Sequence, residues 1–211
     1  MSWPDRDAWR AWLRFVALFC LAFFPVYAGA AWLALAAQPG HALYFAFERD
    51  IPLIPWMIWP YLSLFSLYLL PLFLLTPTQT VILTCQSLLC VVVAGVVFVV
   101  LPVRTGFAPV QVEGLHAPVF VLLRLVDVPL NTNLAPSLHV AGAALLLLAC
   151  ASRAPRWLAL ACLVWLPVIS ASTVLVHQHH ILDVASGFAL ALLARRVFPL
   201  PPQVTPPAAT A

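Results

Sequence analysis

Apolar residues form long runs in this chain, and most polar residues are confined to the short segments between them. A helix that crosses a bilayer needs about 20 mostly apolar residues. The runs therefore predict an all-α protein, an integral membrane bundle of six transmembrane helices. Prolines bend or delay the second run, and Pro136, a residue favoured in a first helical turn, sets the start of the short fourth run. The six runs are Phe15–Ala37, Ile51–Leu74, Val81–Leu101, Pro136–Ala151, Trp157–Val176 and His180–Phe198.

A long connection, Pro102–Ala135, separates the third and fourth runs. It contains an apolar piece, Ala117–Val126, which Arg124 interrupts and which is too short to span; we expect it to lie in the membrane interface. Residues 200–211 are rich in Pro and Ala, and we expect them to form a disordered tail. The predicted organisation is one membrane-embedded domain, residues 1–199, followed by this tail.

Composition supports the membrane prediction. Of the 211 residues, 64% are hydrophobic and only 8% are charged, and the mean hydropathy is +1.03. A soluble domain of this length does not need so much apolar surface. All ten basic residues are arginines, and they are scattered along the chain, so the net charge of +3 does not indicate nucleic-acid binding. The five cysteines lie inside apolar runs and show no metal-binding spacing.

Arginine bias predicts the orientation of the helices. With six spans, seven arginines share the side of the N-terminus, and three lie on the opposite side. The N-terminus is therefore predicted to be cytoplasmic. We expect a multi-pass protein of a bacterial inner membrane. The same topology puts Arg104, His139, Ser172 and His179 on the non-cytoplasmic face, where we expect the active site.

The residues best suited to chemistry lie in two short segments. Asn133-Leu-Ala-Pro-Ser-Leu-His139 is one, and Ser172-Thr-Val-Leu-Val-His-Gln-His-His-Ile-Leu-Asp183 is the other. Neutral imidazole can attack phosphorus. Asp183 follows His179 by four residues, so on a helix the two share a face and the carboxylate can orient the ring. His139 can protonate a leaving oxygen. We predict His179 as nucleophile, Asp183 as its orienting partner and His139 as general acid and base.

These segments resemble the second and third signature motifs of the type-2 phosphatidic acid phosphatase superfamily. The matching residues are Pro136-Ser-Leu-His139 and Ser172-x6-His179-x3-Asp183. The Pro-Ser-Leu-His form, with Asn133 before it, is most similar to the branch that includes the inositol-phosphorylceramide synthases. The resemblance covers roughly Pro102 to Gly187 and implies a six-helix membrane fold, a phosphohistidine intermediate, a lipid phosphate substrate, and neither a metal nor another cofactor.

Phosphate binding is predicted for four further residues. Arg104 in Pro102-Val-Arg104 resembles a degenerate first motif, although this chain has no Lys and Thr105 follows the arginine. Ser137 lies at a predicted helix start, which attracts anions, and is equally suited to capping that helix. Thr173 stands where the third motif usually has Arg, and His177 is expected to supply part of the missing positive charge. We expect His180 to lie in the membrane interface.

Three functions remain open from the sequence. The first is a metal-independent membrane phosphatase or phosphotransferase, in which water or a lipid or sugar hydroxyl accepts the phosphoryl group. The second is a zinc site made from His177, His179, His180 and Asp183, with His139 approaching from another helix. The third is a non-enzymatic transporter or assembly module. The expected partners are a lipid phosphate and membrane lipids, and not nucleic acid; the substrate lipid and the oligomeric state are left open.

Overall fold

The computed structural model describes residues 3–37, 41–108, 111–127 and 133–201. These residues form α-helices and 3-10 helices, and within them no β-strand occurs beyond an isolated bridge between His41 and Val103. The predicted all-α class is confirmed. The α-helices are α1 (Arg6–Ala37), α2 (Ile58–Leu67), α3 (Leu70–Leu74), α4 (Pro77–Val100), α5 (Ala117–Asp127), α6 (Leu138–Ala151), α7 (Arg156–Leu175) and α8 (Ile181–Val197), and the 3-10 helices are η1 (Ala46–Asp50), η2 (Pro55–Met57) and η3 (Gly114–His116).

Local sequence explains where several helices begin. The Asp5 carboxylate accepts a hydrogen bond from the Ala8 amide at the start of α1. Thr76 caps α4 by accepting from the Gln79 amide, and Pro77 occupies the first turn of that helix. The Ser137 hydroxyl accepts from the Val140 amide at the start of α6. Such caps satisfy amides that have no partner within the helix, and each contributes about 1 kcal/mol.

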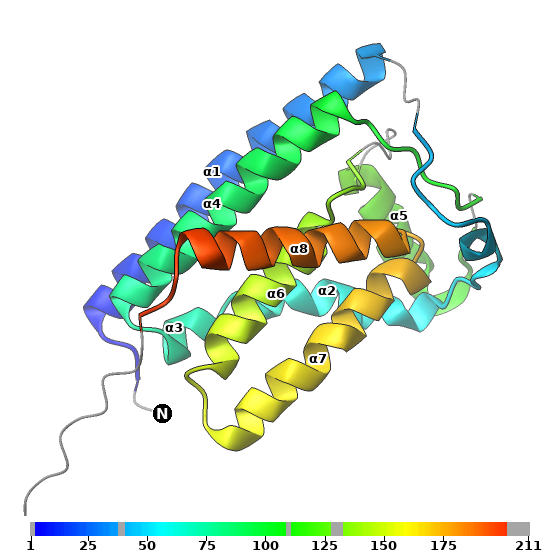
Figure 1. The fold of residues 1–211 in the computed structure, drawn as a ribbon. Helices are drawn as coiled ribbons and strands as arrows, with labels where there is room; N and C mark the ends of the chain where they lie inside the picture. Colours follow the sequence, from blue (N-terminus) through cyan, green and yellow to red (C-terminus); the bar gives the residue numbers. More distant parts are fainter. Residues whose placement is uncertain (1–2, 38–40, 109–110, 128–132, 202–211) are drawn as a thin grey trace, which may run out of the picture.

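Helix α6 lies at the centre of the molecule. It packs against α2, α3, α4, α7 and α8, and Figure 1 shows it crossed by α8 and flanked by α7. Most of its side chains between Val140 and Cys150 are buried. Its contact with α8 is close, since a Cβ added at Gly187 would lie 2.5 Å from the Ser137 carbonyl oxygen. Small residues on α6 and α8 therefore let these two backbones approach each other.

Helices α1 and α4 form a second long pair. They run side by side for most of their length (Figure 1). A Cβ added at Gly95 of α4 would lie 2.2 Å from Cγ1 of Val26 on α1, so this glycine permits the close packing. The pair extends the bundle beyond α6, and α1 supplies one wall of the cavity described below.

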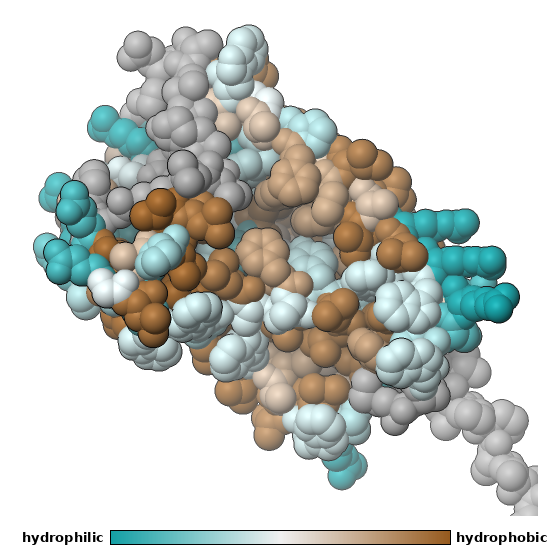
Figure 2. Space-filling view, turned by 180° about the vertical axis from the view of Figure 1, so that it is seen from behind, coloured by the Kyte–Doolittle hydropathy of each residue, from teal (hydrophilic) through white to brown (hydrophobic). Residues whose placement is uncertain are grey.

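The surface is that of a membrane protein. Three helical segments are long and apolar enough to cross a bilayer: Arg6–Leu33, Pro77–Val100 and Arg156–Leu175. Many large apolar side chains on these helices are exposed, including Leu21, Val100 and Trp157. Figure 2 shows apolar side chains spread across much of the face turned away from the viewer in Figure 1. Extensive exposed apolar surface indicates contact with lipid.

The helices differ in length from the six predicted spans. The predicted span Ile51–Leu74 is divided into η2, α2 and α3, with a break at Tyr68 and Leu69. Pro71 in the first turn of α3 lacks the amide hydrogen that a continuous helix would use. Helix α6 has 14 residues and α8 has 17, fewer than a perpendicular crossing requires.

The structure also describes the apolar piece between the third and fourth runs and the first residues of the C-terminal segment. The apolar piece Ala117–Val126 does form a separate short helix, α5, with Val121 and Leu122 exposed. Of the tail predicted for residues 200–211, the structure describes two residues: Leu200 packs against the core, and the Pro201 carbonyl accepts a hydrogen bond from Arg153. The remaining ten tail residues lie outside the described part of the chain.

Candidate active site

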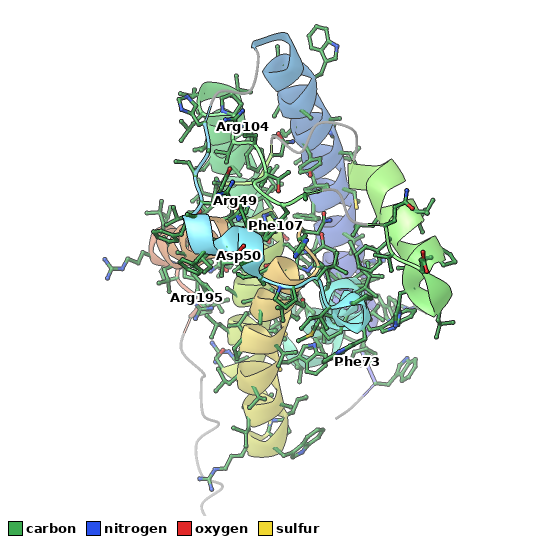
Figure 3. All side chains as sticks on the ribbon, turned by 90° about the vertical axis from the view of Figure 1, so that its right-hand side faces the viewer. Arg49, Asp50, Phe73, Arg104, Phe107 and Arg195 are labelled. Carbon is green, nitrogen blue, oxygen red and sulfur yellow. The ribbon has the colours of Figure 1, made fainter. Side chains whose placement is uncertain are left out.

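Three connecting segments meet at one end of the bundle. They are residues 41–51, residues 103–107 and residues 177–180. The Arg104 amide donates to the His41 carbonyl at 3.0 Å, and the His177 Nε2 lies 3.0 Å from the Ile51 carbonyl oxygen. Figure 3 views this end, with Arg49, Asp50, Arg104 and Phe107 labelled. Segments far apart in the sequence thus converge around the predicted catalytic residues.

His139 is the second residue of α6. Its ring stacks on Tyr61 of α2, with centroids 4.0 Å apart and an angle of 11° between the planes. Phe65 meets the same ring edge to face at 6.4 Å. The Nε2 atom is buried and, among the described residues, has no hydrogen-bond partner. Stacking therefore fixes the plane of the imidazole and leaves one ring nitrogen available for a substrate.

His179 lies in the connection between α7 and α8. The Thr173 carbonyl accepts hydrogen bonds from the amides of both Gln178 and His179, each at 3.0 Å, and this holds the connection against the end of α7. The His179 Nδ1 lies 3.6 Å from Asp183 Oδ2. That distance is slightly too long for a hydrogen bond, although it keeps the carboxylate beside the ring.

The expectation that His179 and Asp183 share a helical face needs correction. Helix α8 begins only at Ile181, and His180 occupies its N-cap. His179 therefore precedes the helix. The pair is still formed because the Asp183 carboxylate folds back to the N-terminus, where Oδ2 accepts a 2.7 Å hydrogen bond from the His180 amide. A carboxylate at the third helical position commonly makes this bond.

Asp183 also connects the two motif segments. Its side chain is fully buried, and its carbonyl accepts a hydrogen bond from the Ser137 amide at 3.1 Å. The residue just before α6 is thus bonded directly to the first turn of α8. This bond and the close approach at Gly187 bring the His139 end of α6 near the His179 connection.

Both predicted catalytic histidines line one cavity of about 450 Å³. Its walls are mainly apolar and aromatic side chains of α1 and α2, and its polar lining includes Gln178 and Asn133. This volume is within the range of small-molecule sites. The other lining residues are Val16, Phe19, Cys20, Phe23, Phe24, Tyr27, Ala31, Tyr61, Leu64, Phe65, Tyr68, Leu123, Leu134 and Leu138.

The residues predicted to bind phosphate do not line this cavity. Arg104 is exposed, on the segment next to the His180 ring. Ser137 is buried and caps α6. The Thr173 hydroxyl is buried and donates to the Ser170 carbonyl at 2.8 Å within α7. The side-chain oxygens of Ser137 and Thr173 are therefore both engaged by their own helices.

His177 also differs from its predicted role as a cation. It has a left-handed backbone with φ of 60°, and its ring stacks on Phe107 with centroids 4.1 Å apart. Burial lowers the pKa of His177 below its ordinary value of 6.5, an effect that outweighs the hydrogen bond to the Ile51 carbonyl. The ring is therefore mainly neutral at pH 7 and supplies little positive charge.

His180, predicted to be interfacial, is enclosed by protein and has no exposed surface for lipid contact. It is fully buried, with Nδ1 3.0 Å from Glu48 Oε2 and Nε2 accepting from the Gly106 amide at 2.9 Å. Glu48 was missed by the sequence analysis. It lies 132 residues away from its partner, and nothing in the short run Glu48-Arg49-Asp50 distinguishes it from its acidic neighbour.

The zinc alternative finds little support in this arrangement. The described residues contain no group of three or more His, Cys, Asp or Glu side chains positioned to hold a metal ion. Both ring nitrogens of His180 have protein partners, and one nitrogen of His177 contacts a backbone carbonyl.

Comparison of the chain with protein-family models, with curated proteins and with solved structures gives no match. The candidate site therefore has to be judged on its own geometry. It consists of two imidazole rings at one apolar cavity, with a buried carboxylate beside one ring. This set of groups is suited to nucleophilic attack and proton transfer on an amphipathic substrate.

Proposed function

We propose that this protein is a metal-independent membrane phosphatase or phosphotransferase that acts on a lipid phosphate through a phosphohistidine. One observation carries the proposal: His139 and His179, from separate segments, line the same cavity, and Asp183 lies beside the Nδ1 of His179. The motifs that resemble the type-2 phosphatidic acid phosphatase superfamily include these three residues.

In the proposed first step, His179 Nε2 attacks phosphorus and the bond from phosphorus to the leaving oxygen breaks. Asp183 faces Nδ1, so it stabilises the positive charge that develops on the ring. His139 gives a proton to the leaving alkoxide. In the second step, His139 removes a proton from water or from an acceptor hydroxyl, whose oxygen attacks phosphorus and releases His179.

The cavity supports an amphipathic substrate. Phe19, Phe23 and Phe24 on α1 offer apolar contact for a hydrocarbon chain, while the histidines and Gln178 provide a polar region. A lipid could then place its phosphate at the imidazoles and its chain against α1 and α2. Arg104 remains our candidate for contacting the phosphate, since the segment that carries it touches the loop of His179 and His180.

The proposed membrane arrangement retains six crossings and a fold like that of the superfamily. The divided segment α2–α3 and the short helices α6 and α8 would cross beside the three long helices, because a bundle interior tolerates broken and short helices better than lipid does. The arginine bias supports a cytoplasmic N-terminus. The candidate site would then face the periplasm or the exterior of a bacterial cell.

The test uses the purified full-length protein in detergent with EDTA present. A panel of lipid phosphomonoesters and lipid phosphodiesters is offered with and without a hydroxyl acceptor, and both phosphate release and transfer to the acceptor are measured. We expect turnover of at least one lipid phosphate, and we expect the chelator to leave it unchanged. Phosphate release identifies a phosphatase, and transfer to the acceptor identifies a phosphotransferase.

Variants connect the activity to the site. His179→Ala and His139→Ala should each abolish turnover, whereas His41→Ala, an exposed histidine outside the cavity, should not. Substrate labelled in its phosphate should leave acid-labile label on the wild-type protein and none on His179→Ala. Loss of activity with EDTA would favour the metal alternative, and no turnover of any lipid phosphate would contradict the proposal.

A further inference from the structure

A second pair of histidine and carboxylate lies next to the first and is entirely buried. Glu48 and His180 both have no exposed surface. Glu48 Oε2 lies 3.0 Å from His180 Nδ1 and accepts a 2.8 Å hydrogen bond from the Ile181 amide. Glu48 Oε1 accepts from the Phe45 amide at 2.8 Å. This carboxylate therefore joins the segment before α2 to the first turn of α8.

The hydrogen bonds of His180 assign its tautomer. The Gly106 amide donates to Nε2 at 2.9 Å, so that nitrogen acts as an acceptor and carries no proton. The proton of the neutral ring must then be on Nδ1, which donates it to Glu48. Both ring nitrogens are satisfied, and neither is available to a substrate.

Stacking holds the same ring from its two sides. Phe107 lies on His180 with centroids 4.3 Å apart and 8° between planes, and Tyr44 stacks at 4.7 Å and 22°. His177 stacks on Phe107 in turn. Gly106 completes this packing, because a Cβ at this position would lie 2.4 Å from Cζ of Tyr44. The ring of His180 thus has little freedom to rotate or shift.

A short path of bonds leads from this pair to the candidate nucleophile. Glu48 holds the His180 ring, and the His180 amide donates to Asp183 Oδ2. The same Oδ2 atom is 3.6 Å from His179 Nδ1. Any displacement of the backbone at residue 180 would therefore move both His179 and the carboxylate oxygen that faces it.

We infer that Glu48 and His180 are positioning residues for His179 and Asp183, an inference that rests on the function proposed above. The pair holds the start of α8 so that the Asp183 carboxylate meets the His179 ring. A misplacement of about 1 Å in a reacting group can cost about 10²-fold in rate. Removing the pair should lower kcat by about 10- to 100-fold, with little effect on KM.

Two substitutions of His180 separate positioning from packing. His180→Asn retains an N–H donor near the Nδ1 position, whereas His180→Phe retains the stacking and removes both nitrogens. Positioning predicts that Asn keeps kcat within about fivefold of wild type and that Phe loses about 10- to 100-fold. A packing role predicts the reverse order. Glu48→Gln gives a second route to the same loss, and Glu113→Gln, an exposed acid, is the matched control.

A spectroscopic measurement tests the pair without any substrate. Protein labelled with ¹⁵N-histidine should show, besides the signals of His179, a ring with a protonated Nδ1 and an unprotonated Nε2 whose signals disappear in His180→Asn. Glu48→Gln should shift the signals of both His180 and His179, and Glu113→Gln should shift neither. Thermal unfolding in detergent shows which variants remain folded. If His180→Phe does not fold, Glu48→Gln takes its place in the kinetic test, and the reverse holds if Glu48→Gln does not fold.

The outcomes distinguish this inference from the proposed function. If the wild-type protein turns over no lipid phosphate but the His180 and His179 signals respond as expected, the function fails and the buried pair stands. If the protein is active and folded Glu48→Gln and His180→Phe keep kcat within about twofold, the positioning role is overturned. A protonated Nε2 on His180 would contradict the assigned tautomer.

Discussion

The two neighbouring histidines His179 and His180 each face a carboxylate, and the two pairs are built differently. In the pair of His180 and Glu48, both ring nitrogens have hydrogen-bond partners and the ring is stacked on two sides. In the pair of His179 and Asp183, the nitrogen and oxygen are 3.6 Å apart and the imidazole lines a cavity. The buried pair is saturated, whereas the pair at the cavity retains bonding capacity that a substrate can use.

The largest expected effect is on kcat and comes from replacing His179. His179→Asn should lower kcat on a lipid phosphate by at least about 10³-fold, since the nucleophile is lost. The fold should survive, because the backbone bond from His179 to Thr173 does not involve the side chain. Steady-state kinetics and circular dichroism check both points. Retained turnover in this variant would show that His179 is not the nucleophile.

Asp183→Asn tests whether the 3.6 Å contact between the Asp183 carboxylate and His179 Nδ1 matters for catalysis. The amide can still accept the hydrogen bond from the His180 backbone, so the helix start should persist. The negative charge beside His179 is lost, and kcat should fall by about 10²-fold or more. An unchanged kcat with a lowered melting temperature would mean that Asp183 acts only as a helix cap.

A smaller effect, a loss of stability, is expected from Gly106→Ala, which crowds the rings around His180 and Glu48. The new methyl group would overlap the Tyr44 ring and disturb its stack on His180, so the free energy of unfolding should fall by about 1–3 kcal/mol. Gly29→Ala on α1 is the control, because a Cβ there meets no atom within 4 Å. Equal stability of the two variants in detergent would show that the stacked rings are loosely packed.

The smallest effect is expected from His177→Phe. Because burial lowers the pKa of His177, its ring is mainly neutral at pH 7 and phosphate gains little from it. Phe preserves the stack on Phe107, so KM between pH 7 and pH 8 should stay within about threefold of wild type. Arg104→Ala is the comparison and should raise KM by about tenfold. A large rise in KM for His177→Phe would restore His177 as a phosphate ligand.

Local pattern accounts for much of the agreement between sequence and structure. Long apolar runs identify α1, α4 and α7, because helix length and lipid contact leave few alternatives for such segments. The start predicted for the fourth run at Pro136 is two residues too early, because α6 begins at Leu138 and Ser137, rather than the proline, occupies its N-cap. The break between α2 and α3 was harder to place, since four prolines occur in that region and only packing decides which of them ends a helix.

The candidate site also combines features that local sequence indicates with contacts that only packing sets. The spacing of His179 and Asp183 indicated that they are close, although it assumed the wrong backbone between them. Ser137 and Thr173 have hydroxyl groups that a phosphate could use, but both are engaged by their own helices. Sequence spacing therefore identified residue types suited to the chemistry better than it identified the bonds they make.

The sequence by itself determined that this is a helical membrane protein and that its candidate chemistry lies in two short polar segments, because hydrophobicity and residue type act locally. Only the tertiary structure decided that His180 is buried against Glu48, and that His139 and His179 share one cavity. Those contacts join residues separated by 40 to 132 positions. They depend on how helices pack, which no local pattern specifies.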